Sequence, residues 1–375
     1  MSGMNQKRKN IIIILPSLAR EGGINLAYTI SRYLVEKGFG IIIINLNPNC
    51  LEMIDEFNSL KIKIIKIDLK NRFLRYINLT YSVYKICKRY KPEAVLSILF
   101  GWHLFIALGA KLALVKKIIV HVGNLAPYWE PSFWKFKLLV RIAEPFTDKL
   151  ICCSDFIRKT TIKHFGVSTN HTYLIYNSID PVFSNCYTKK NPKKKNNFNI
   201  GVIGRLDDNR DYETLIESIS ELNRKNLSIH FTIVGDGVAF KFLEKKIQTL
   251  NLEGITTMTG TQSNIAKVLE DFDIFAWPAL YREGFGMALI EAICAGIPCV
   301  VTDTPSSREL LNEKYFEFVI PKNASSMADG LLNVMSNYQV AIEKTNKMRN
   351  EIIEKFSFEK MAKKYMEAMG LEIKY

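Results

Sequence analysis

The chain has 375 residues, of which 48% are hydrophobic and 23% charged, so it is an ordinary globular protein and not a disordered one. This length is enough for two domains, each with its own core. The net charge of +14 is uneven: residues 1–197 hold 31 Lys or Arg against 12 Asp or Glu, a net +19, and residues 198–375 have a net −5.

A basic half beside a mildly acidic half suggests a surface that meets anions, either a membrane or a phosphorylated acceptor. The alternative is a lysine-rich, AT-biased genome, which the many Lys, Asn and Ile residues support. Genome bias alone would not confine the excess to one half, and both interpretations stay open.

The cysteines and the apolar runs both indicate a cytoplasmic protein. The seven cysteines, including the adjacent Cys152 and Cys153, show no disulfide framework and no zinc spacing, so reduced thiols are expected. No signal peptide is predicted, because the run Ile11–Leu15 is short and ends at a proline. The run Ala94–Ala110 is too short to span a membrane and is interrupted by Gly101, which predicts a buried strand followed by a core helix.

In the first half, Ile- and Val-rich runs alternate with helical segments, which indicates a parallel sheet covered on both faces. Strands are predicted at Asn10–Leu15, Ile41–Asn45, Lys61–Ile67, Ala94–Leu99, Lys117–His121 and Lys149–Cys153. Gly22 and Gly23 open a helix predicted to continue over Ile24–Lys37, and its first amides suit an anion, although a plain tight turn explains the glycines equally well. His121 ends a strand, where α/β sheets bind ligands, and is a candidate for polar contact; a buried core histidine is the alternative.

The pattern restarts after a basic, patternless stretch at 186–197, which is the predicted linker. The predicted organisation is therefore a first domain over 1–185, a second over 198–358, and a C-terminal helix over 359–375 that is a candidate to cross back to the first domain. Strands are predicted at Asn199–Ile203, Ser228–Val234, Ile274–Trp277 and Cys299–Thr302, with helices at Tyr212–Asn223, Ala239–Asn251, Asn264–Glu270 and Met287–Ala295.

The most informative segment runs from Arg282 to Pro298 and holds two carboxylates eight residues apart, Glu283 and Glu291. Glycines at 284 and 286 let backbone N–H groups approach a ligand closely. Glu291 lies about two helical turns further on, so both carboxylates can face one ligand. Acceptors beside exposed amides suit a ligand rich in hydroxyls, such as a sugar joined to a nucleotide.

Two arginines follow the first strand of the second half. Gly204-Arg205 comes directly after this strand and Arg210 lies five residues later, positions from which guanidinium groups can hold a diphosphate. A surface ion pair is the alternative for each arginine. Gly235 begins a Gly-Asp-Gly turn after the next strand; it lacks the third glycine of a dinucleotide fingerprint, so it is interpreted as a sharp turn that can touch the ligand.

These segments resemble the retaining GT-B glycosyltransferases of family 4 (group 1), in which the spacing of Glu283 and Glu291 is the E-x7-E signature. The resemblance covers nearly the whole chain and is strongest from 201 to 302. It implies an α/β fold of the GT-B class, two Rossmann-like domains whose parallel sheets face an inter-domain cleft. In the family's segment a Lys-Gly pair stands where this chain has Arg210 and Asp211, so the positive charge is kept and a negative charge is added beside it.

The resemblance also implies a role for each site residue. Glu283 and the amides of Gly284, Phe285, Gly286 and Met287 would hold the donor sugar, and Glu291 the ribose. Arg205 and Arg210, next to Gly204, would stabilise the leaving diphosphate, and Gly235 would lie near the base. From the residues alone, Gly204, Gly22 and Gly23 are further donor-binding candidates. His121 would orient the donor sugar. Catalytic roles fall to His121, Glu283, Arg205 and Arg210.

The implied reaction moves a sugar from a nucleotide-sugar to a lipid-linked or phosphorylated glycan, as in bacterial capsule, O-antigen or lipopolysaccharide assembly. Gly286, where the family commonly has Pro, favours a UDP-sugar. No cofactor, metal ion or nucleic acid partner is expected, and Asp271 and Asp273 are interpreted as strand entry and helix capping. A GT-B-shaped nucleotide-sugar epimerase and a non-catalytic nucleotide-sugar-binding module remain the alternatives.

One helical segment, at 131–146, mixes aromatic and basic residues, including Phe133, Trp134, Lys135 and Lys137. This mixture suits the headgroup level of an anionic membrane, so peripheral contact with the inner face of the cell membrane is one interpretation. A helix packed on the core with lysines reaching to solvent is the other.

Overall fold

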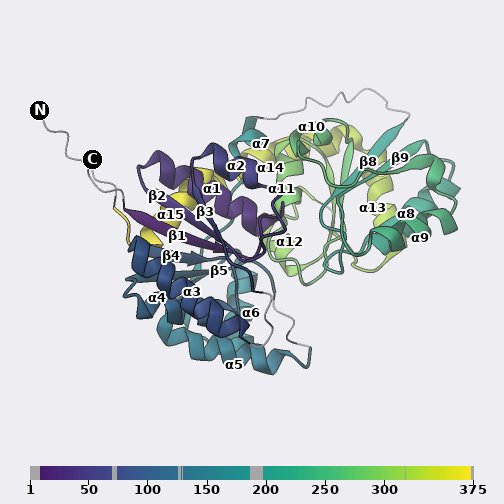
Figure 1. Ribbon diagram of the computed structural model, residues 1–375. Coiled ribbons are helices and arrows are strands. Elements are labelled where there is room, and N and C mark those ends of the chain that lie inside the picture. Colours follow the sequence, from purple (N-terminus) through teal and green to yellow (C-terminus); the bar gives the residue numbers. More distant parts are fainter. Residues whose placement is uncertain are drawn as a thin grey trace, which may run out of the picture. The chain divides into compact units, whose positions relative to one another are not determined.

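The structure is a computed structural model and describes residues 9–69, 74–125, 128, 130–185, 197–316 and 318–372. The chain forms two compact units (Figure 1): unit 1 comprises Met1–Ser178 and Phe358–Tyr375, and unit 2 comprises Ile179–Ser357. Residues 179–185 belong to unit 2, where the backbone N–H of Ile179 donates to the carbonyl of Phe356 at 3.0 Å. The predicted basic linker, apart from residue 197, lies outside the described residues.

Unit 1 contains a parallel sheet of seven strands in the order β3-β2-β1-β4-β5-β6-β7. The chain begins at the centre of the sheet, moves to one edge, and then crosses back to build the other half. The strands are β1 (Asn10–Leu15), β2 (Gly40–Asn45), β3 (Lys63–Lys66), β4 (Ala94–Ser97), β5 (Lys117–Val122), β6 (Lys149–Cys152) and β7 (Thr172–Leu174). The point where the order reverses lies between β1 and β4, and such points are where doubly wound sheets bind ligands.

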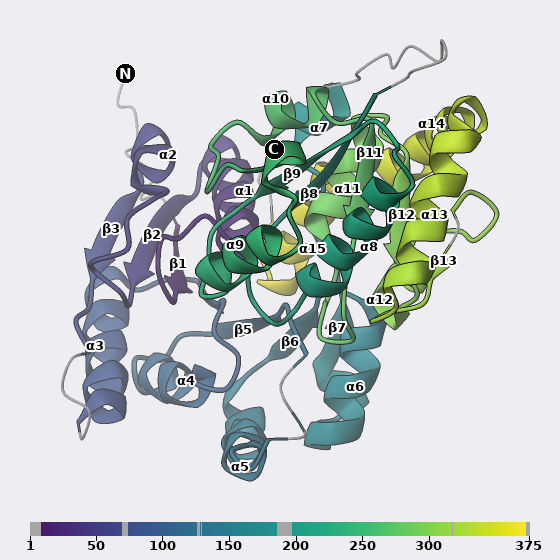
Figure 2. The same ribbon diagram turned by 90° about the vertical axis from the view of Figure 1, so that its right-hand side faces the viewer.

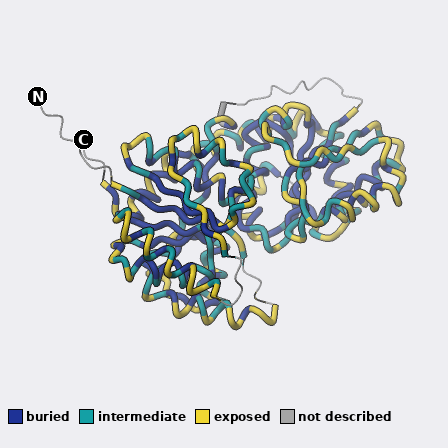
Figure 3. The backbone as a smooth tube through the Cα atoms, viewed as in Figure 1, coloured by how far each residue is buried: buried dark blue, intermediate teal, exposed yellow. Residues whose placement is uncertain are grey.

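The central strands of unit 1 are apolar on both faces because helices cover both. In β1, Ile11 and Ile13 pack into one core cluster while Ile12 and Ile14 pack into another, and all four are fully buried. Alternate residues of a strand point to opposite faces, so a run of four isoleucines supplies both layers at once. Figure 3 shows these strands as the buried centre of the unit.

The helices of unit 1 form two layers, one on each side of the sheet (Figure 1). The first layer holds α1 (Gly22–Glu36), α2 (Ile54–Ser59) and α15 (Phe358–Ala368). The second holds α3 (Arg75–Tyr90), α4 (His103–Leu112) and α5 (Phe133–Ala143), with α4 packed against both of its neighbours. The helix α6 (Asp155–Phe165) and the short η1 (Glu144–Phe146) and η2 (Thr169–His171) complete the unit.

The C-terminal helix α15 is part of unit 1, although it follows all of unit 2 in sequence. It packs against α1, and the ring of Phe358 meets the ring of Tyr33 edge-on at 5.8 Å. Its buried residues, Met361 and Tyr365 among them, join the core cluster of β1 and α1. The apolar residues of α15 therefore gain their burial from the first unit.

Unit 2 repeats the architecture with six parallel strands in the order β10-β9-β8-β11-β12-β13. The strands are β8 (Phe198–Ile203), β9 (Ile229–Val234), β10 (Thr256–Met258), β11 (Ile274–Trp277), β12 (Cys299–Thr302) and β13 (Phe318–Val319). Here the order reverses between β8 and β11, the two strands that the predicted arginine and glutamate segments follow. The α/β fold of two Rossmann-like domains with parallel sheets is thereby confirmed.

Helices cover both faces of this second sheet (Figure 2). One face packs on α8 (Tyr212–Arg224), α9 (Phe240–Thr249) and α13 (Ala324–Ser336) through Ile200, Val202 and Ile233. On the other face α11 (Met287–Cys294) contacts β11, β12 and α14 (Tyr338–Lys355). The remaining elements are α7 (Pro181–Asn185), α10 (Ile265–Glu270), α12 (Pro305–Leu310) and η3 (Glu253–Ile255).

Polar residues stabilise the first turns of several helices. The side chain of Ser154 accepts a hydrogen bond from the N–H of Ile157 at the start of α6, and Gly166 ends the same helix in the left-handed conformation. No helix in the described part of the chain has both the length and the apolar character needed to cross a membrane. The run Ala94–Ala110 forms β4 and α4, as predicted.

Candidate active site

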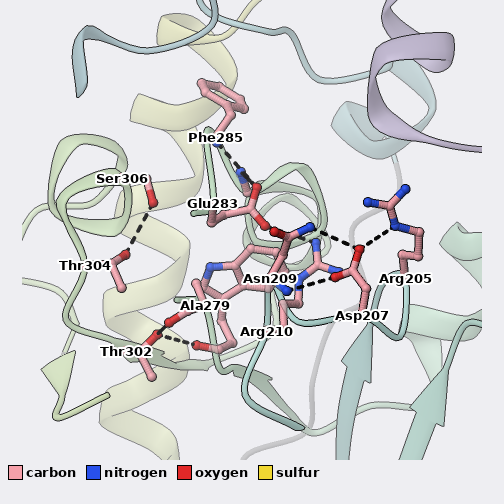
Figure 4. A network of polar contacts seen from close by, with 12 residues as sticks. Arg205, Asp207, Asn209, Arg210, Ala279, Glu283, Phe285, Thr302, Thr304 and Ser306 are labelled. Atoms are coloured by element: carbon pink, nitrogen blue, oxygen red, sulfur yellow. Dashed lines mark hydrogen bonds and ion pairs between the residues drawn. The ribbon is translucent and has the colours of Figure 1, made fainter. Parts of the chain in front are cut away.

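Two loops meet at the carboxyl ends of β8 and β11 in unit 2. The loop after β8 lies antiparallel to the loop after β11: the N–H of Asp211 donates to the carbonyl of Pro278 at 2.9 Å, and that of Leu280 to the carbonyl of Asn209 at 3.1 Å. Between these bonds Arg210 and Ala279 form an isolated bridge. This pairing brings two segments about 70 residues apart into one polar network (Figure 4).

The ion pair of Arg210 and Glu283 lies at the centre of this network. Arg210 Nη2 is 3.3 Å from Glu283 Oε2, and the two side chains are only 14% and 13% exposed. The guanidinium carbon lies 4.5 Å from the ring centroid of Trp277, a cation–π contact from the end of β11. Arg210 Nε is buried and has no hydrogen-bond partner among the described residues, so the group has donor capacity to spare.

Gly204 makes room for this guanidinium. A Cβ atom at this position would lie 1.7 Å from Arg210 Nη1, and the backbone has φ +155°. Any larger residue would push Arg210 away from the end of β8. The glycine and arginine of the predicted phosphate segment therefore depend on each other sterically.

Glu283 also fixes the turn that leads into α11. Its Oε1 accepts hydrogen bonds from the N–H groups of Gly286, at 3.2 Å, and Phe285, at 3.5 Å. The predicted ligand-binding amides of these two residues are therefore occupied by Glu283 itself. Gly284 is buried in the same turn, and Met287 is the first residue of α11.

Gly286 and Phe285 shape this turn in different ways. Gly286 caps α11 with φ +84°, a conformation that proline cannot adopt because its ring fixes φ near −65°. A proline at this position would therefore require a different local turn. The side chain of Phe285 is 2% exposed and packs edge-on against Phe356, so it serves the core of the unit and only its backbone can face a ligand.

Arg205 lies at the rim of the site and is 49% exposed. Its Nε is 2.6 Å from Asp207 Oδ2, so the ion pair that the sequence left open for this residue is present. Asp207 also accepts from Asn209, through the backbone N–H and the side-chain amide, both at 3.0 Å. Arg205 is thus held at the end of β8 while much of its surface faces solvent.

Asp211, the departure from the family's glycine, has a structural role. Its carboxylate accepts from the N–H of Thr214 at 3.1 Å and from the Thr214 hydroxyl at 2.6 Å, and so caps α8. The Gly235 turn lies alongside, because the N–H of Gly204 donates to Val234 and that of Leu206 to Asp236, both at 2.9 Å. Gly235 is therefore adjacent to the arginine segment.

Glu291 has surroundings unlike those of Glu283. It lies within α11, and burial together with the negative charge of Asp180 raises the pKa of its carboxyl group to about 7. Asp180 precedes α7, which contacts α11. A carboxyl group in this state can donate as well as accept a hydrogen bond near neutral pH.

This raised pKa predicts a pH dependence of stability. Between pH 4.5 and 7 the folded state holds the Glu291 proton while the unfolded state releases it, so the free energy of unfolding falls as pH rises through this window and is flat above it. The loss has an upper limit of about 3.5 kcal/mol, at about 1.4 kcal/mol per pKa unit. Glu291→Gln should therefore stabilise the protein at pH 8 and much less at pH 5, in urea unfolding at both values. The exposed Glu253→Gln is the control, and equal effects of Glu291→Gln at pH 5 and 8 would contradict the assignment.

The predicted residues of unit 1 lie at the carboxyl ends of β1 and β5. Gly22 and Gly23 are the first two residues of α1, and Gly22 is exposed. His121 is 3% exposed, and its Nδ1 is 2.8 Å from the hydroxyl of Tyr365. Burial lowers the pKa of His121 to about 4, so the ring is neutral at physiological pH. His103 is buried as well, and its Nδ1 accepts the N–H of Gly101 at 2.9 Å.

The two aspartates before β11 have the structural roles expected of them at the strand entry. Asp273 is 3% exposed and accepts the N–H of Asn199 at 2.8 Å, while Asp271 follows the last residue of α10 and its carbonyl accepts from Asn199 Nδ2 at 2.9 Å. Among the described residues no group of three or more His, Cys, Asp or Glu could hold a metal ion.

The sequence did not identify several residues of the network. Trp277 and Asp207 both contact the predicted arginines, and their positions at a strand end and two residues after Arg205 were the available signals. Buried hydroxyls after β12 were also missed: Thr302 Oγ1 donates to the carbonyl of Ala279 at 2.7 Å, and Thr304 lies 2.9 Å from the hydroxyl of Ser307. They hold the base of the β11 loop and the start of α12 (Figure 4).

Comparison with known families agrees with this geometry. The model of glycosyl transferases group 1 matches residues 185–355, and that of glycosyltransferase family 4 matches residues 21–183. The chain belongs to the group 1, family 4 glycosyltransferases. Together the two matches cover both units of this glycosyltransferase and include the arginine and glutamate segments.

Two relatives indicate the range of the family. The glycosyltransferase is 27% identical over 298 residues to UDP-Gal:alpha-D-GlcNAc-diphosphoundecaprenol alpha-1,3-galactosyltransferase of Escherichia coli, over 76% of each chain. It is 26% identical over 234 residues to N-acetylgalactosamine-N,N'-diacetylbacillosaminyl-diphospho-undecaprenol 4-alpha-N-acetylgalactosaminyltransferase of Campylobacter jejuni, over 61% of this chain and 63% of the relative.

Solved structures share the fold of this glycosyltransferase. Anabaena Alr3699/HepE in complex with UDP-glucose matches with a TM-score of 0.83 and 17% identity, over 96% of this chain and 99% of that one. A glycosyltransferase from Rickettsia africae matches with a TM-score of 0.80 and 20% identity, over 97% and 98%. The GT-B assignment is confirmed at the level of fold.

Proposed function

We propose that this glycosyltransferase moves a sugar from a UDP-sugar to a lipid-linked or phosphorylated glycan, with retention of anomeric configuration, in the assembly of bacterial surface polysaccharide. The observation that carries the proposal is the network of Arg210, Glu283 and the turn amides, which lies where the strand order of unit 2 reverses, between β8 and β11. The relatives above support the acceptor class, because both are named for acceptors on diphosphoundecaprenol and for alpha linkages.

The two arginines can stabilise the negative charge that the reaction leaves on the diphosphate. When the bond between the anomeric carbon and the diphosphate oxygen breaks, the electron pair stays on the leaving diphosphate. Arg205 at the rim and Arg210, with its spare Nε donor, are placed to neutralise that charge without a metal ion. Metal independence is thus part of the proposal.

The two carboxyl groups are proposed to bind different parts of the nucleotide-sugar donor. Glu283 and the turn from Gly284 to Met287 would bind the hydroxyls of the transferred sugar, a hexose or N-acetylhexosamine. The hydrogen bonds between the Glu283 carboxylate and the turn amides would rearrange as the donor enters. Glu291, with its pKa near neutrality, would both donate to and accept from the ribose hydroxyls. Gly235 would border the base, Gly22 and Gly23 would offer amides to the donor, and His121 would contact the sugar as a neutral ring.

A panel of donors tests the proposal directly. We expect UDP and one or more UDP-sugars to raise the melting temperature of the protein, and GDP-sugars to leave it unchanged, because a ligand bound only to the folded state stabilises it. Addition of EDTA should not alter the shift. The proposal fails if no nucleotide-sugar stabilises the protein, and turnover of donor to an epimer without any acceptor would favour the epimerase.

A lipid-linked acceptor would require the protein to reach a membrane surface, and unit 1 has exposed apolar residues that suit such contact. On α5, Trp134, Leu138 and Ile142 are 72%, 60% and 46% exposed, and their spacing of four residues places them on one face of the helix. We call these three residues the α5 stripe. The helix has three cationic residues, Lys135, Lys137 and Arg141, and no acidic one.

A second exposed set lies at the start of α3, in the same helical layer as α5 (Figure 1). Leu74, Ile77 and Tyr81 are 46%, 66% and 57% exposed. Beside them runs an open groove of about 770 Å³ lined by tyrosines and basic residues, among them Lys63, Tyr81, Tyr84, Lys85, Lys88, Arg89 and Tyr90. Aromatic rings with adjacent cations match an anionic lipid surface, which we propose as the partner of this layer.

Removing the α5 stripe should weaken membrane binding. We expect Trp134→Ser/Leu138→Ser to lower binding to phosphatidylglycerol vesicles at least tenfold, because two exposed apolar side chains lose their burial in the interface. Cosedimentation measures the binding, which should weaken with salt and be small on phosphatidylcholine. The control is Phe242→Ser on α9 of unit 2, which is 53% exposed. Equal binding of the double variant and the unchanged protein would exclude the stripe as the docking surface.

A further inference from the structure

The contact between His121 and Tyr365 joins two distant parts of the sequence inside unit 1. His121 lies near the end of β5 and Tyr365 on the C-terminal helix α15, 244 positions later. The hydroxyl of Tyr365 is 2.8 Å from Nδ1 of His121, and both residues are buried, with 0% and 3% of their surfaces exposed. The helix that returns from unit 2 therefore brings a polar group to the candidate catalytic histidine.

The two ring nitrogens of His121 face different surroundings. Nδ1 faces α15, while Nε2 faces the backbone of Gly123, where an added Cβ would lie 2.9 Å from it. Gly123 follows β5 and is partly exposed, at the end of the sheet where ligands bind. The carbonyl of Gly123 is held by the thiol of Cys153 at 3.1 Å, which fixes this strand end. Nε2 is thus the nitrogen on the ligand side.

The hydrogen bond selects one of the two neutral forms of the ring. Burial keeps the pKa of His121 low, at about 4, and holds the pKa of Tyr365 well above its ordinary value, so the imidazole is neutral and the phenol keeps its proton. If Nδ1 carried the hydrogen, it would donate to the phenol oxygen and leave the phenol hydrogen without this acceptor inside the core, which is unfavourable. With Nε2 protonated, the phenol donates to Nδ1, so the phenol hydrogen and Nδ1 are both satisfied and Nε2–H stays available as a donor.

We propose that Tyr365 is a positioning residue that holds His121 in the Nε2–H form, so that this N–H is presented as a hydrogen-bond donor to an oxygen of the donor sugar. The inference rests on the proposed function of His121 and assigns to the C-terminal helix a part in that function. An N–H group at Nε2 can donate a hydrogen bond to a sugar hydroxyl or ring oxygen. A protonated Nε2 cannot act as a general base.

Tyr365→Phe tests this inference, because it removes one hydroxyl and keeps the ring in the core. In the full-length protein with ¹⁵N-labelled histidine, we expect the ring nitrogens of His121 to show the Nε2–H form, and the variant to show a mixture of both forms. His121→Ala assigns the signals. Release of UDP from whichever of UDP-glucose, UDP-galactose and their N-acetylamino counterparts the enzyme uses should fall about tenfold.

Controls separate positioning from loss of stability. Tyr338→Phe removes a comparable buried hydroxyl in unit 2, 3.2 Å from the carbonyl of Asp273, and should leave the His121 spectrum and the turnover unchanged. In a His121→Ala background, Tyr365→Phe should cause no further loss. An unchanged spectrum and unchanged turnover in Tyr365→Phe would overturn the inference. Full turnover by His121→Ala would instead remove the proposed role of His121, and with it the functional part of the inference.

Discussion

Arg210→Ala should lower the rate of sugar transfer by about 10²- to 10³-fold, the loss typical of removing one preorganised charge-stabilising donor. Arg210 is held on three sides, by Glu283 at 3.3 Å, by the Trp277 ring at 4.5 Å, and by the glycine at 204. Such a group needs no reorganisation when charge develops on the diphosphate. Steady-state kinetics and calorimetric titration with UDP measure the loss in turnover and in affinity.

Arg210→Lys separates charge from geometry. Because the related family segment has lysine at the matching position, we expect this variant to stay within about tenfold of the unchanged enzyme, with the deficit due to the lost guanidinium contact over the Trp277 ring. The exposed Arg224→Ala, in the last turn of α8, is the matched control for loss of a positive charge. Full turnover by Arg210→Ala would refute the proposed role in leaving-group stabilisation.

Glu283→Ala should have an effect of similar size but of a different kind. The variant loses the acceptor that holds the N–H of Gly286 and leaves Arg210 without its buried partner, so both the turn and the guanidinium become less well defined. We expect kcat to fall about 10²-fold or more, and the free energy of unfolding to fall by about 1–3 kcal/mol. Affinity for UDP alone should change little, whereas the extra stabilisation given by the sugar of a UDP-sugar should disappear.

Glu283→Gln keeps an acceptor oxygen for the turn and removes only the charge, so its loss should be smaller than that of the alanine variant. Glu244→Ala, exposed on α9, is the control for removal of a carboxylate elsewhere in unit 2. If Glu283→Ala weakened UDP and UDP-sugar to the same extent, the carboxylate would act on the nucleotide and not on the sugar.

Much of the fold could be predicted from local pattern. The strands at Asn10–Leu15, Ile274–Trp277 and Cys299–Thr302 lie at the predicted bounds, because runs of Ile, Val and aromatic residues bounded by polar residues have few other conformations in a covered parallel sheet. Short helices and strands were harder to predict from the sequence. The helix α2 and the edge strand β7 have six and three residues, too few to show a period.

The candidate site was predicted as a set of residue types and not as an arrangement. The sequence singled out Arg205, Arg210, Glu283 and Glu291 but could not show that two of them pair, since they stand on loops after different strands. It also took the amides of Phe285 and Gly286 as available to a ligand, whereas they bond to Glu283. Their role towards the donor remains a proposal.

By itself, then, the sequence determined the two α/β units, the family and the chemical groups at the switch point, because these follow from periodicity, glycine positions and residue type within short windows. Only the tertiary structure decided that Arg210 lies over the ring of Trp277, that burial and the nearby Asp180 raise the pKa of Glu291, and that Tyr365 reaches His121. Each of these contacts joins residues far apart in the chain. They depend on how loops and a returning helix pack, and no local sequence window contains that information.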